Sequence, residues 1–273
     1  MRGLLINGKP SELLPALDRG LQFGDGLFET LAVKDGRPCL WDAHLARLRL
    51  GCERLGIPMP DPESLRAEAE SLVAGHARAV LKLMLTRGCG GRGYRPPDDP
   101  QPNRVMLLAE WPDYPAEWQS TGVKIRLCRT RLGLNPDLAG IKHLNRLEQV
   151  LARSEWDDPA IAEGLLCDLD GRVIEGTASN LFLQRDGRLL TPRLDRCGVA
   201  GVMRARVMQL AESMGQPVLE QDLGLVDLER AEALYLSNSL IGIWQVRQFA
   251  ERDYAGAKPH PVMAVVLETA FGP

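Results

Sequence analysis

Three of the four Asp-Gly dipeptides lie between two short runs of apolar and β-branched residues, and they constrain the possible fold of this chain most. Asp-Gly is a preferred pair for the two-residue turn of a β-hairpin, because both positions of that turn need positive φ angles. The dipeptides at 35–36, 170–171 and 186–187 predict strand pairs at 27–33 with 38–41, 164–168 with 173–175, and 180–183 with 189–191. Antiparallel hairpins are therefore expected near the start of the chain and again beyond residue 160.

Helices with one apolar face are predicted between the strands. Asp42 is expected to cap a helix whose apolar face carries Leu45, Leu48, Cys52 and Leu55. Asp61 and Pro62 are a cap followed by an N1 proline, and they predict a second helix that ends near Gly75. Further strands are predicted at 79–86, 104–109, 123–128, 233–236 and 243–246. Residues 111–115 hold two prolines and no periodicity, which indicates a domain boundary.

Composition excludes several classes of protein. The 273 residues carry a net charge of −3, so no general attraction to nucleic acid or to an anionic membrane is expected. No apolar run reaches membrane-spanning length, and the N-terminal apolar run is too short for a signal peptide. The six cysteines are scattered without a CxxC pair, which argues against a disulfide framework and against a zinc site. A cytoplasmic enzyme without a metal is the class expected.

Lys142 is the residue whose surroundings point most directly to chemistry. It follows Gly140 and Ile141, and a helix with an apolar stripe (Leu144, Leu147, Val150, Leu151) is predicted directly after it. The chain has only six lysines against 27 arginines, and a partly buried lysine can lose its proton and become a nucleophile, which an arginine cannot. On the residues alone, a nucleophilic lysine and a lysine that merely lies near a helix start both stay open.

Other segments suggest places for anions. A glycine turn at 198–201 leads into a predicted helix, which would combine free N–H groups with the positive end of the helix dipole. The glycine-rich loop at 87–94 carries Arg92 and lacks the spacing of a phosphate-binding P-loop, so that closure over a carboxylate is the better interpretation. Arg47 and Glu175, taken singly, look like ordinary surface charges.

Together these residues match the needs of a pyridoxal phosphate site: a lysine for the aldehyde, a cation and a helix N-terminus for the phosphate, and an anion for the ring nitrogen. Nearly the whole chain resembles the fold-type IV pyridoxal phosphate enzymes, the group of the branched-chain and D-amino-acid aminotransferases. The similar stretches are DRGLQFGDGLFET (18–30), TRGCGGRGY (86–94), LAGIKHLNRLEQVLAR (138–153), VIEGTASNLF (173–182), TPRLDRCGVAGVMR (191–204) and SNSLIGIWQV (237–246). Within the family, GGRGY and GIKHLNRLEQVLAR most resemble the lyases that act on 4-amino-4-deoxychorismate.

The resemblance implies a role for each of ten residues. Lys142 would bind the cofactor and transfer protons, with Thr30 lining the site beside it. The remaining cofactor contacts implied are Glu175 at the ring nitrogen, and Arg47, Gly201, Val202, Met203 and Ser239 at the phosphate. Asn238 and Arg92 are implied as binders of the substrate carboxylates. The implied products are 4-aminobenzoate and pyruvate, in folate synthesis.

The resemblance also implies a two-domain α/β (α+β) fold with the cofactor in the interdomain cleft, and a homodimer. The expected division is a small domain at 1–108, a linker at 109–118, and a large domain at 119–273 that carries the lysine. Two other functions stay open. An aminotransferase on the same fold would use the same lysine, glutamate and arginine, and a non-enzymatic protein would keep an idle site.

Overall fold

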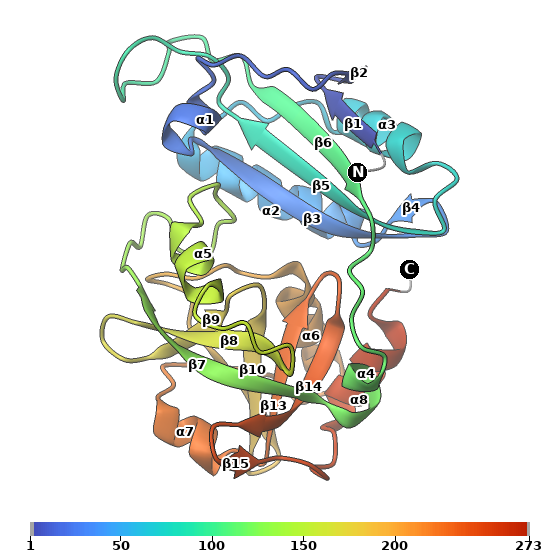
Figure 1. Cartoon of the computed structure of the whole chain (residues 1–273), viewed down its shortest axis with the longest axis vertical. Coiled ribbons are helices and arrows are strands. Elements are labelled where there is room, and N and C mark those ends of the chain that lie inside the picture. Colours follow the sequence, from blue (N-terminus) through green and yellow to red (C-terminus); the bar gives the residue numbers. More distant parts are fainter. Residues whose placement is uncertain (1–2, 272–273) are drawn as a thin grey trace. The chain divides into compact units, whose positions relative to one another are not determined.

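The computed structural model describes residues 3–271, which form two compact units, each with its own sheet (Figure 1). Within the described residues, unit 1 comprises 3–112, 141–145 and 271, and unit 2 comprises 113–140 and 146–270. The expected division at 109–118 stays a prediction. In the structure the short segment 141–145, which includes Lys142, groups with unit 1.

Unit 1 is a six-stranded antiparallel sheet with two long helices. Its strands lie in the order β2-β1-β6-β5-β3-β4. The elements are β1 (Gly3–Ile6), β2 (Lys9–Pro10), α1 (Arg19–Phe23), β3 (Gly26–Lys34), β4 (Arg37–Pro38), α2 (Trp41–Leu55), α3 (Pro62–Val73), β5 (Arg78–Thr86) and β6 (Asn103–Ala109).

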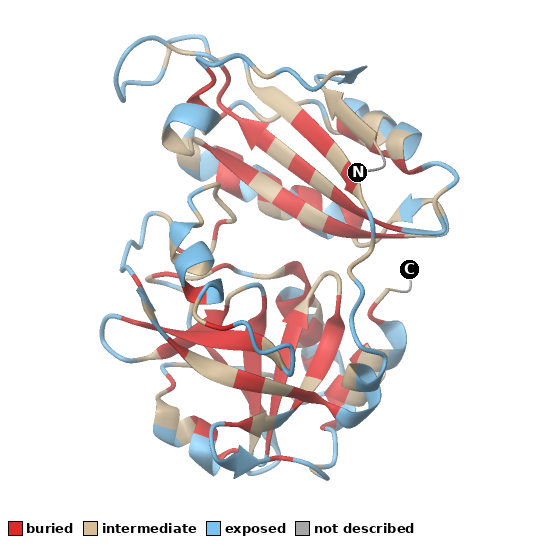
Figure 2. Cartoon of the chain, viewed as in Figure 1, coloured by how far each residue is buried: buried red, intermediate tan, exposed pale blue. Residues whose placement is uncertain are grey.

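Residues in the strands of unit 1 alternate between buried and less buried positions (Figure 2). On β5, Leu81, Leu83 and Leu85 are buried, while the residues between them are half-buried. Leu48 of α2 and Leu65 of α3 are also buried. This alternation is the pattern of a sheet with one face under helices, and burial of apolar side chains on that face is the main source of its stability.

Unit 2 holds a larger, mixed sheet. Its path is β12-β11-β10-β13-β14-β7-β8-β9, with β15 beside β14. The strands are β7 (Val123–Leu132), β8 (Ile161–Asp168), β9 (Val173–Gly176), β10 (Asn180–Arg185), β11 (Arg188–Pro192), β12 (Leu219–Gln221), β13 (Ala233–Asn238), β14 (Gly242–Phe249) and β15 (Arg252–Asp253). The helices are α4 (Glu117–Thr121), α5 (Leu147–Arg153), α6 (Val202–Ser213), α7 (Leu225–Arg230) and α8 (Pro261–Thr269).

The sheet of unit 2 closes on itself. β9 pairs with β8 and also with β10, where Asn180 lies opposite Glu175. The path from β10 through β13, β14, β7, β8 and β9 therefore returns to β10, with parallel pairing only where β7 meets β14 and β8. Leu181, Leu234 and Val246 are among the fully buried residues of the core cluster in this unit.

The three hairpins predicted from Asp-Gly are confirmed. β3 pairs with β4, β8 with β9, and β10 with β11, all antiparallel. Both residues have positive φ in two of the turns, 48° and 70° at Asp35 and Gly36, and 50° and 68° at Asp186 and Gly187. These φ signs are those of a type I′ turn, which explains why Asp-Gly is found there.

One of the two predicted helix caps is confirmed and the other is wrong. The Asp61 side chain accepts a hydrogen bond from the Ser64 amide at the start of α3. Asp42 instead lies in the first turn of α2, after Leu40 in a left-handed conformation, and pairs with Arg66 at 2.7 Å. A carboxylate in the first turn is still favourable, because it faces the positive end of the helix dipole. Among residues 3–271, no helix is long and apolar enough to cross a membrane.

Candidate active site

Lys142 is held by backbone pairing with β3 of unit 1. The Phe28 amide donates to the Lys142 carbonyl, and the Leu144 amide donates to the Gly26 carbonyl, both at 2.9 Å. The Lys142 ammonium group lies 4.3 Å from the centre of the Phe28 ring. A strand edge therefore fixes the lysine backbone, while the aromatic face contacts its charged end.

The helix predicted to hold the lysine does not do so. α5 begins only at Leu147, and the apolar stripe after it is exposed: Leu147, Val150 and Leu151 are 76%, 60% and 61% exposed. The helix predicted directly after Lys142 is therefore present, but it starts five residues further along the chain. Within this seven-residue helix only Ala152 is buried, so the stripe has no core to join in the described part of the chain.

Thr30 lies on the same face of β3 as Phe28, because alternate strand residues share a face. It is half-buried and lies across from Lys82 of β5. Phe28 contacts the Lys142 ammonium group, and the predicted place of Thr30 beside the lysine stays a prediction.

Arg47 belongs to a buried cluster with Glu29 and His44. Glu29 on β3 is only 1% exposed, and His44 and Arg47 are one turn apart on α2. Arg47 Nε donates to Glu29 Oε1 at 2.8 Å, its Nη2 donates to Glu29 Oε2, and His44 Nδ1 lies 2.6 Å from Glu29 Oε2. Arg47 is therefore a partly buried arginine that donates two hydrogen bonds to Glu29, and not the solvated surface charge that it resembles in the sequence.

The charges of this cluster follow from its burial. Burial alone would raise the pKa of Glu29, but the Arg47 guanidinium and the hydrogen bond from His44 lower that pKa to about 2. For His44, burial is the main cause of a lowered pKa, and the positive charges of Arg47 and Lys142 act in the same direction. An ionised carboxylate has no proton to donate, so neutral His44 donates from Nδ1 to Glu29.

In unit 2, Glu175 lies at the point where β9 meets β10. It is 4% exposed, and its Oε2 accepts a hydrogen bond of 2.8 Å from the Val199 amide. Burial lowers the pKa of the Arg146 side chain, and the negative charge of Glu175 only partly offsets this effect. Glu175 is thus a buried carboxylate and not the surface residue that it resembles when taken alone.

The segment that leads into α6 is shaped by glycines. Gly201 is the N-cap of α6, and no side chain caps this helix in the described structure. A Cβ atom at Gly201 would lie 2.0 Å from Asn180 Oδ1, while Asn180 Nδ2 donates to the Val199 carbonyl at 2.8 Å. Val202 and Met203 follow in the first turn of α6, where backbone amides are the usual binding groups for an anion.

The remaining predicted residues lie at a strand end and in loops. Asn238 ends β13; its Oδ1 accepts from the amides of Leu240 and Ile241, and its Nδ2 donates to the Ala178 carbonyl at 3.0 Å. Its amide group is therefore already used to shape the turn. Ser239 follows it and is half-buried, and Arg92 is exposed in the glycine-rich loop of unit 1.

The ten predicted site residues divide between the two units. Unit 1 contains Thr30, Arg47, Arg92 and Lys142, and unit 2 contains Glu175, Gly201, Val202, Met203, Asn238 and Ser239. Their roles stay predictions. The structure adds three residues that sequence reasoning missed: Glu29, His44 and Asn180. Glu29 could have been noticed as a charge on the apolar face of a strand that also holds Leu27, Leu31 and Val33.

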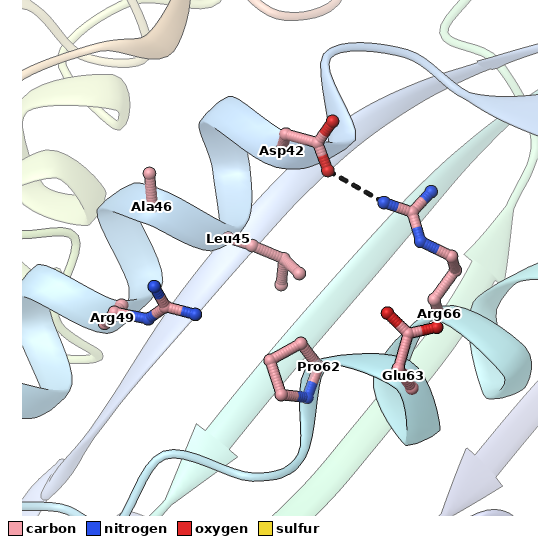
Figure 3. A pocket seen from close by; sticks show the side chains of 7 residues that line it. All are labelled: Asp42, Leu45, Ala46, Arg49, Pro62, Glu63 and Arg66. Carbon is pink, nitrogen blue, oxygen red and sulfur yellow. Dashed lines mark hydrogen bonds and ion pairs between the residues drawn. The ribbon is translucent and has the colours of Figure 1, made fainter.

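A surface pocket of about 250 Å³ lies between α2 and α3 (Figure 3). It is lined by Asp42, Leu45, Ala46, Arg49, Pro62, Glu63 and Arg66. The Asp42–Arg66 ion pair at its rim is exposed to solvent, and no predicted site residue lines it. Because none of the predicted site residues lines it, this pocket is not taken as the candidate active site.

The chain belongs to the class IV amino-transferase family, whose model matches residues 26–249. It is 40% identical to an aminodeoxychorismate lyase of Vibrio harveyi over 238 residues, covering 87% of this chain and 88% of the relative. A solved structure of 4-amino-4-deoxychorismate lyase from Pseudomonas aeruginosa superposes with a TM-score of 0.91 at 47% identity, covering 97% of each chain. A D-alanine aminotransferase of Listeria monocytogenes is 30% identical, covering 90% of this chain and 86% of the relative.

These similarities confirm the expected fold class, a mixed α/β fold of the fold-type IV group. They also confirm the resemblance on which the sequence-based roles rest.

Proposed function

We propose that the chain is a pyridoxal phosphate-dependent lyase that converts 4-amino-4-deoxychorismate to 4-aminobenzoate and pyruvate, in the synthesis of folate. The observation that carries this proposal is the likeness to the Pseudomonas aeruginosa lyase, which extends over 97% of both chains at 47% identity. Aminotransferases are less similar, at 30% identity for the D-alanine enzyme and 34% for a probable branched-chain enzyme of Thermotoga maritima. We place the enzyme in the cytoplasm, as expected from the sequence.

The residues of both units fit this cofactor. In unit 2, the uncapped start of α6 and the close approach that Gly201 allows suit a phosphate, and the buried Glu175 carboxylate suits a protonated ring nitrogen. In unit 1, Lys142 supplies the amine and Arg47 a cation. When bound, pyridoxal phosphate supplies an electron sink for the carbanion formed at the substrate carbon next to nitrogen.

The chain's own groups would then move protons and exclude water. The Lys142 amine takes the proton from the substrate carbon that bears nitrogen, and Lys142 Nζ later returns a proton to the departing enolpyruvate. Glu175 places a negative charge where the ring nitrogen must stay protonated. Loss of the enolpyruvyl group makes the substrate ring aromatic, so the elimination is favourable and the protein mainly has to position groups.

One assay separates the lyase from the alternatives. The holoenzyme is supplied with 4-amino-4-deoxychorismate and, separately, with D-alanine or a branched-chain amino acid plus 2-oxoglutarate. We expect release of pyruvate and 4-aminobenzoate in equal amounts, without 2-oxoglutarate. Turnover that requires 2-oxoglutarate would replace this proposal by an aminotransferase, and cofactor binding without any turnover would indicate an idle site.

We also propose that the protein is a homodimer, as the family resemblance implies. The exposed stripe of Leu147, Val150 and Leu151 supports this, because a contiguous apolar patch on a short helix is typical of a surface that another chain covers. Changing both Leu147→Glu and Leu151→Glu is expected to halve the mass measured by light scattering. Leu169→Glu, at an exposed leucine in the β8–β9 turn, serves as the control. A monomeric unaltered protein, or a dimer in the double variant, would refute this use of the stripe.

A further inference from the structure

The glycine-rich loop between β5 and β6 is exposed at its tip, but the buried Arg19 side chain binds its backbone. Arg92, Gly93, Tyr94 and Arg95 are all exposed. Beneath them, Arg19 of α1 is only 3% exposed. Its Nη2 donates to the Tyr94 carbonyl at 2.9 Å, and its Nη1 donates to the carbonyls of Gly93 and Arg95 at 3.1 and 3.4 Å. Arg19 therefore binds three successive carbonyls directly after Arg92.

A second set of contacts holds Arg19 itself. Arg19 Nε donates to Asp25 Oδ2 at 2.8 Å, and Asp25 also accepts from Arg87 Nε at 2.8 Å. These hydrogen bonds and the two positive charges outweigh burial and lower the pKa of Asp25. Arg19 thus binds an ionised carboxylate through Nε and the loop carbonyls through Nη1 and Nη2. A lysine could not make both sets of contacts, because it lacks the planar guanidinium group with several fixed N–H donors.

Asp18, next to Arg19, connects the two ends of the same loop. Its Oδ1 caps α1 by accepting from the Gly20 amide at 2.8 Å. Its Oδ2 accepts from Thr86 Oγ1 at 2.6 Å and from Asn103 Nδ2 at 2.7 Å. Thr86 ends β5 and Asn103 begins β6, so one buried carboxylate holds the points where the loop leaves and rejoins the sheet.

Close packing on the side of the loop completes the arrangement. The rings of Phe23 and Tyr94 lie 5.3 Å apart, and the Arg19 guanidinium lies 4.9 Å from the centre of the Phe23 ring. A Cβ atom at Gly90 would lie 2.9 Å from Arg19 Cδ. Gly90 thus lets the loop backbone approach the arginine, where a side chain would collide with it.

We propose that Arg19 is a positioning residue of the enzyme: it fixes the backbone at 93–95 and thereby sets where Arg92 meets a carboxylate of the substrate. The inference rests on the proposed function, since that function gives Arg92 its substrate. Arg19 itself contacts the loop. Its loss should weaken substrate binding without changing the cofactor site, because the Lys142 segment pairs with Gly26 and Phe28, whereas the Arg19 side chain contacts Asp25, the Phe23 ring and the loop.

The test compares Arg19→Gln with Arg87→Gln in the holoenzyme. Both substitutions remove a buried arginine from Asp25, but the carbonyls bound by Arg87 are those of Leu55 and Gly56, outside the loop. Amide hydrogen exchange over residues 90–96 should become about 10-fold faster or more in Arg19→Gln, the effect of losing charge-assisted hydrogen bonds. It should change little in Arg87→Gln. Arg19→Lys keeps the positive charge beside Asp25, so it is the variant to use if Arg19→Gln does not fold. It should also loosen the loop, because a lysine cannot bind three carbonyls and Asp25 at once.

Kinetics then test whether Arg19 acts through Arg92. We expect Arg19→Gln to raise KM about 10-fold with kcat changed less than about 3-fold and the cofactor absorbance unchanged. In an Arg92→Gln background the same substitution should have no further effect on KM. Independent, additive effects on KM, or equal loop exchange in the Arg19 and Arg87 variants, would overturn the inference. The exchange measurement needs no substrate. It therefore tests whether Arg19 holds the loop even if the lyase reaction, and with it the proposed function, turns out to be absent.

Discussion

Replacing Lys142 by alanine is expected to abolish the visible absorbance of bound pyridoxal phosphate and to lower pyruvate release by about 10³-fold or more. The reason is that one amine both holds the aldehyde and transfers the protons. Lys142 is held by pairing with β3 and lies 4.3 Å from the centre of the Phe28 ring, whereas Lys82 of β5 lies across from Thr30 and 5.1 Å from the same ring centre.

Two measurements make this prediction specific. Lys142→Arg keeps the positive charge but cannot bond to an aldehyde, so it should lose the absorbance as fully as Lys142→Ala. Borohydride reduction of the unaltered holoenzyme followed by peptide mapping should place the label on Lys142. Pyruvate release at the normal rate from Lys142→Ala, or a label on another residue, would contradict both the mechanism and the assigned site.

Replacing Glu29 by glutamine is expected to lower the free energy of unfolding by about 3–5 kcal/mol, because it removes a buried carboxylate whose charge is opposite to that of Arg47 and which binds both Arg47 and His44. Glu29 accepts two hydrogen bonds from Arg47 and one from His44, and its side chain is only 1% exposed. Urea unfolding monitored by circular dichroism measures the change. Glu68→Gln is the matched control, because Glu68 also pairs with an arginine, Arg104, but the pair is partly exposed and should contribute less than about 1 kcal/mol.

The same cluster predicts how stability depends on pH. The pKa of Glu29 lies at about 2 in the folded chain against 4.5 for an unperturbed glutamate, so its contribution is fully present above pH 4.5 and is lost as the pH falls toward 2. His44, with a pKa below its usual 6.5, adds a loss of stability that begins as the pH falls through 6.5, because the unfolded chain then binds a proton that the folded chain does not. Unfolding at pH 8, 5.5 and 3.5 should show falling stability, with the loss below pH 4.5 reduced in Glu29→Gln. An equal acid loss in both proteins would refute the role given to Glu29.

The sequence predicted the local parts of this fold well. Asp-Gly turns and an Asp61 cap act through the backbone of a few neighbouring residues, so they are visible without tertiary contacts. The apolar stripe after Lys142 has the same local signature as a core-facing helix, but periodicity alone cannot tell whether the face meets the core or another chain. The exposure of Leu147, Val150 and Leu151 was therefore not visible in the sequence.

The candidate site was predictable only where the resemblance named residues. Arg47 and Glu175 look like surface charges one at a time, and their burial depends on partners that are distant in sequence, such as Glu29 for Arg47 and Val199 for Glu175. Asp18 and Arg19 show the same limit: besides their local contacts, they bind partners 68 or more residues away, at 86, 103 and in the loop at 93–95. Long-range polar pairing leaves no periodic trace in a sequence.

The strand pairing at Asn180 and Glu175 has a consequence for how this protein can change over evolution. One cross-strand pair both seals the ring of strands in unit 2 and carries two side chains that reach the turn before α6, at Val199. A slip of one residue along that seam would turn both side chains to the opposite face of the sheet. Insertions can accumulate in surface turns. The length of chain between 175 and 180, in contrast, has to stay constant if the Glu175 carboxylate and the Asn180 amide are both to bind the backbone of Val199 before α6.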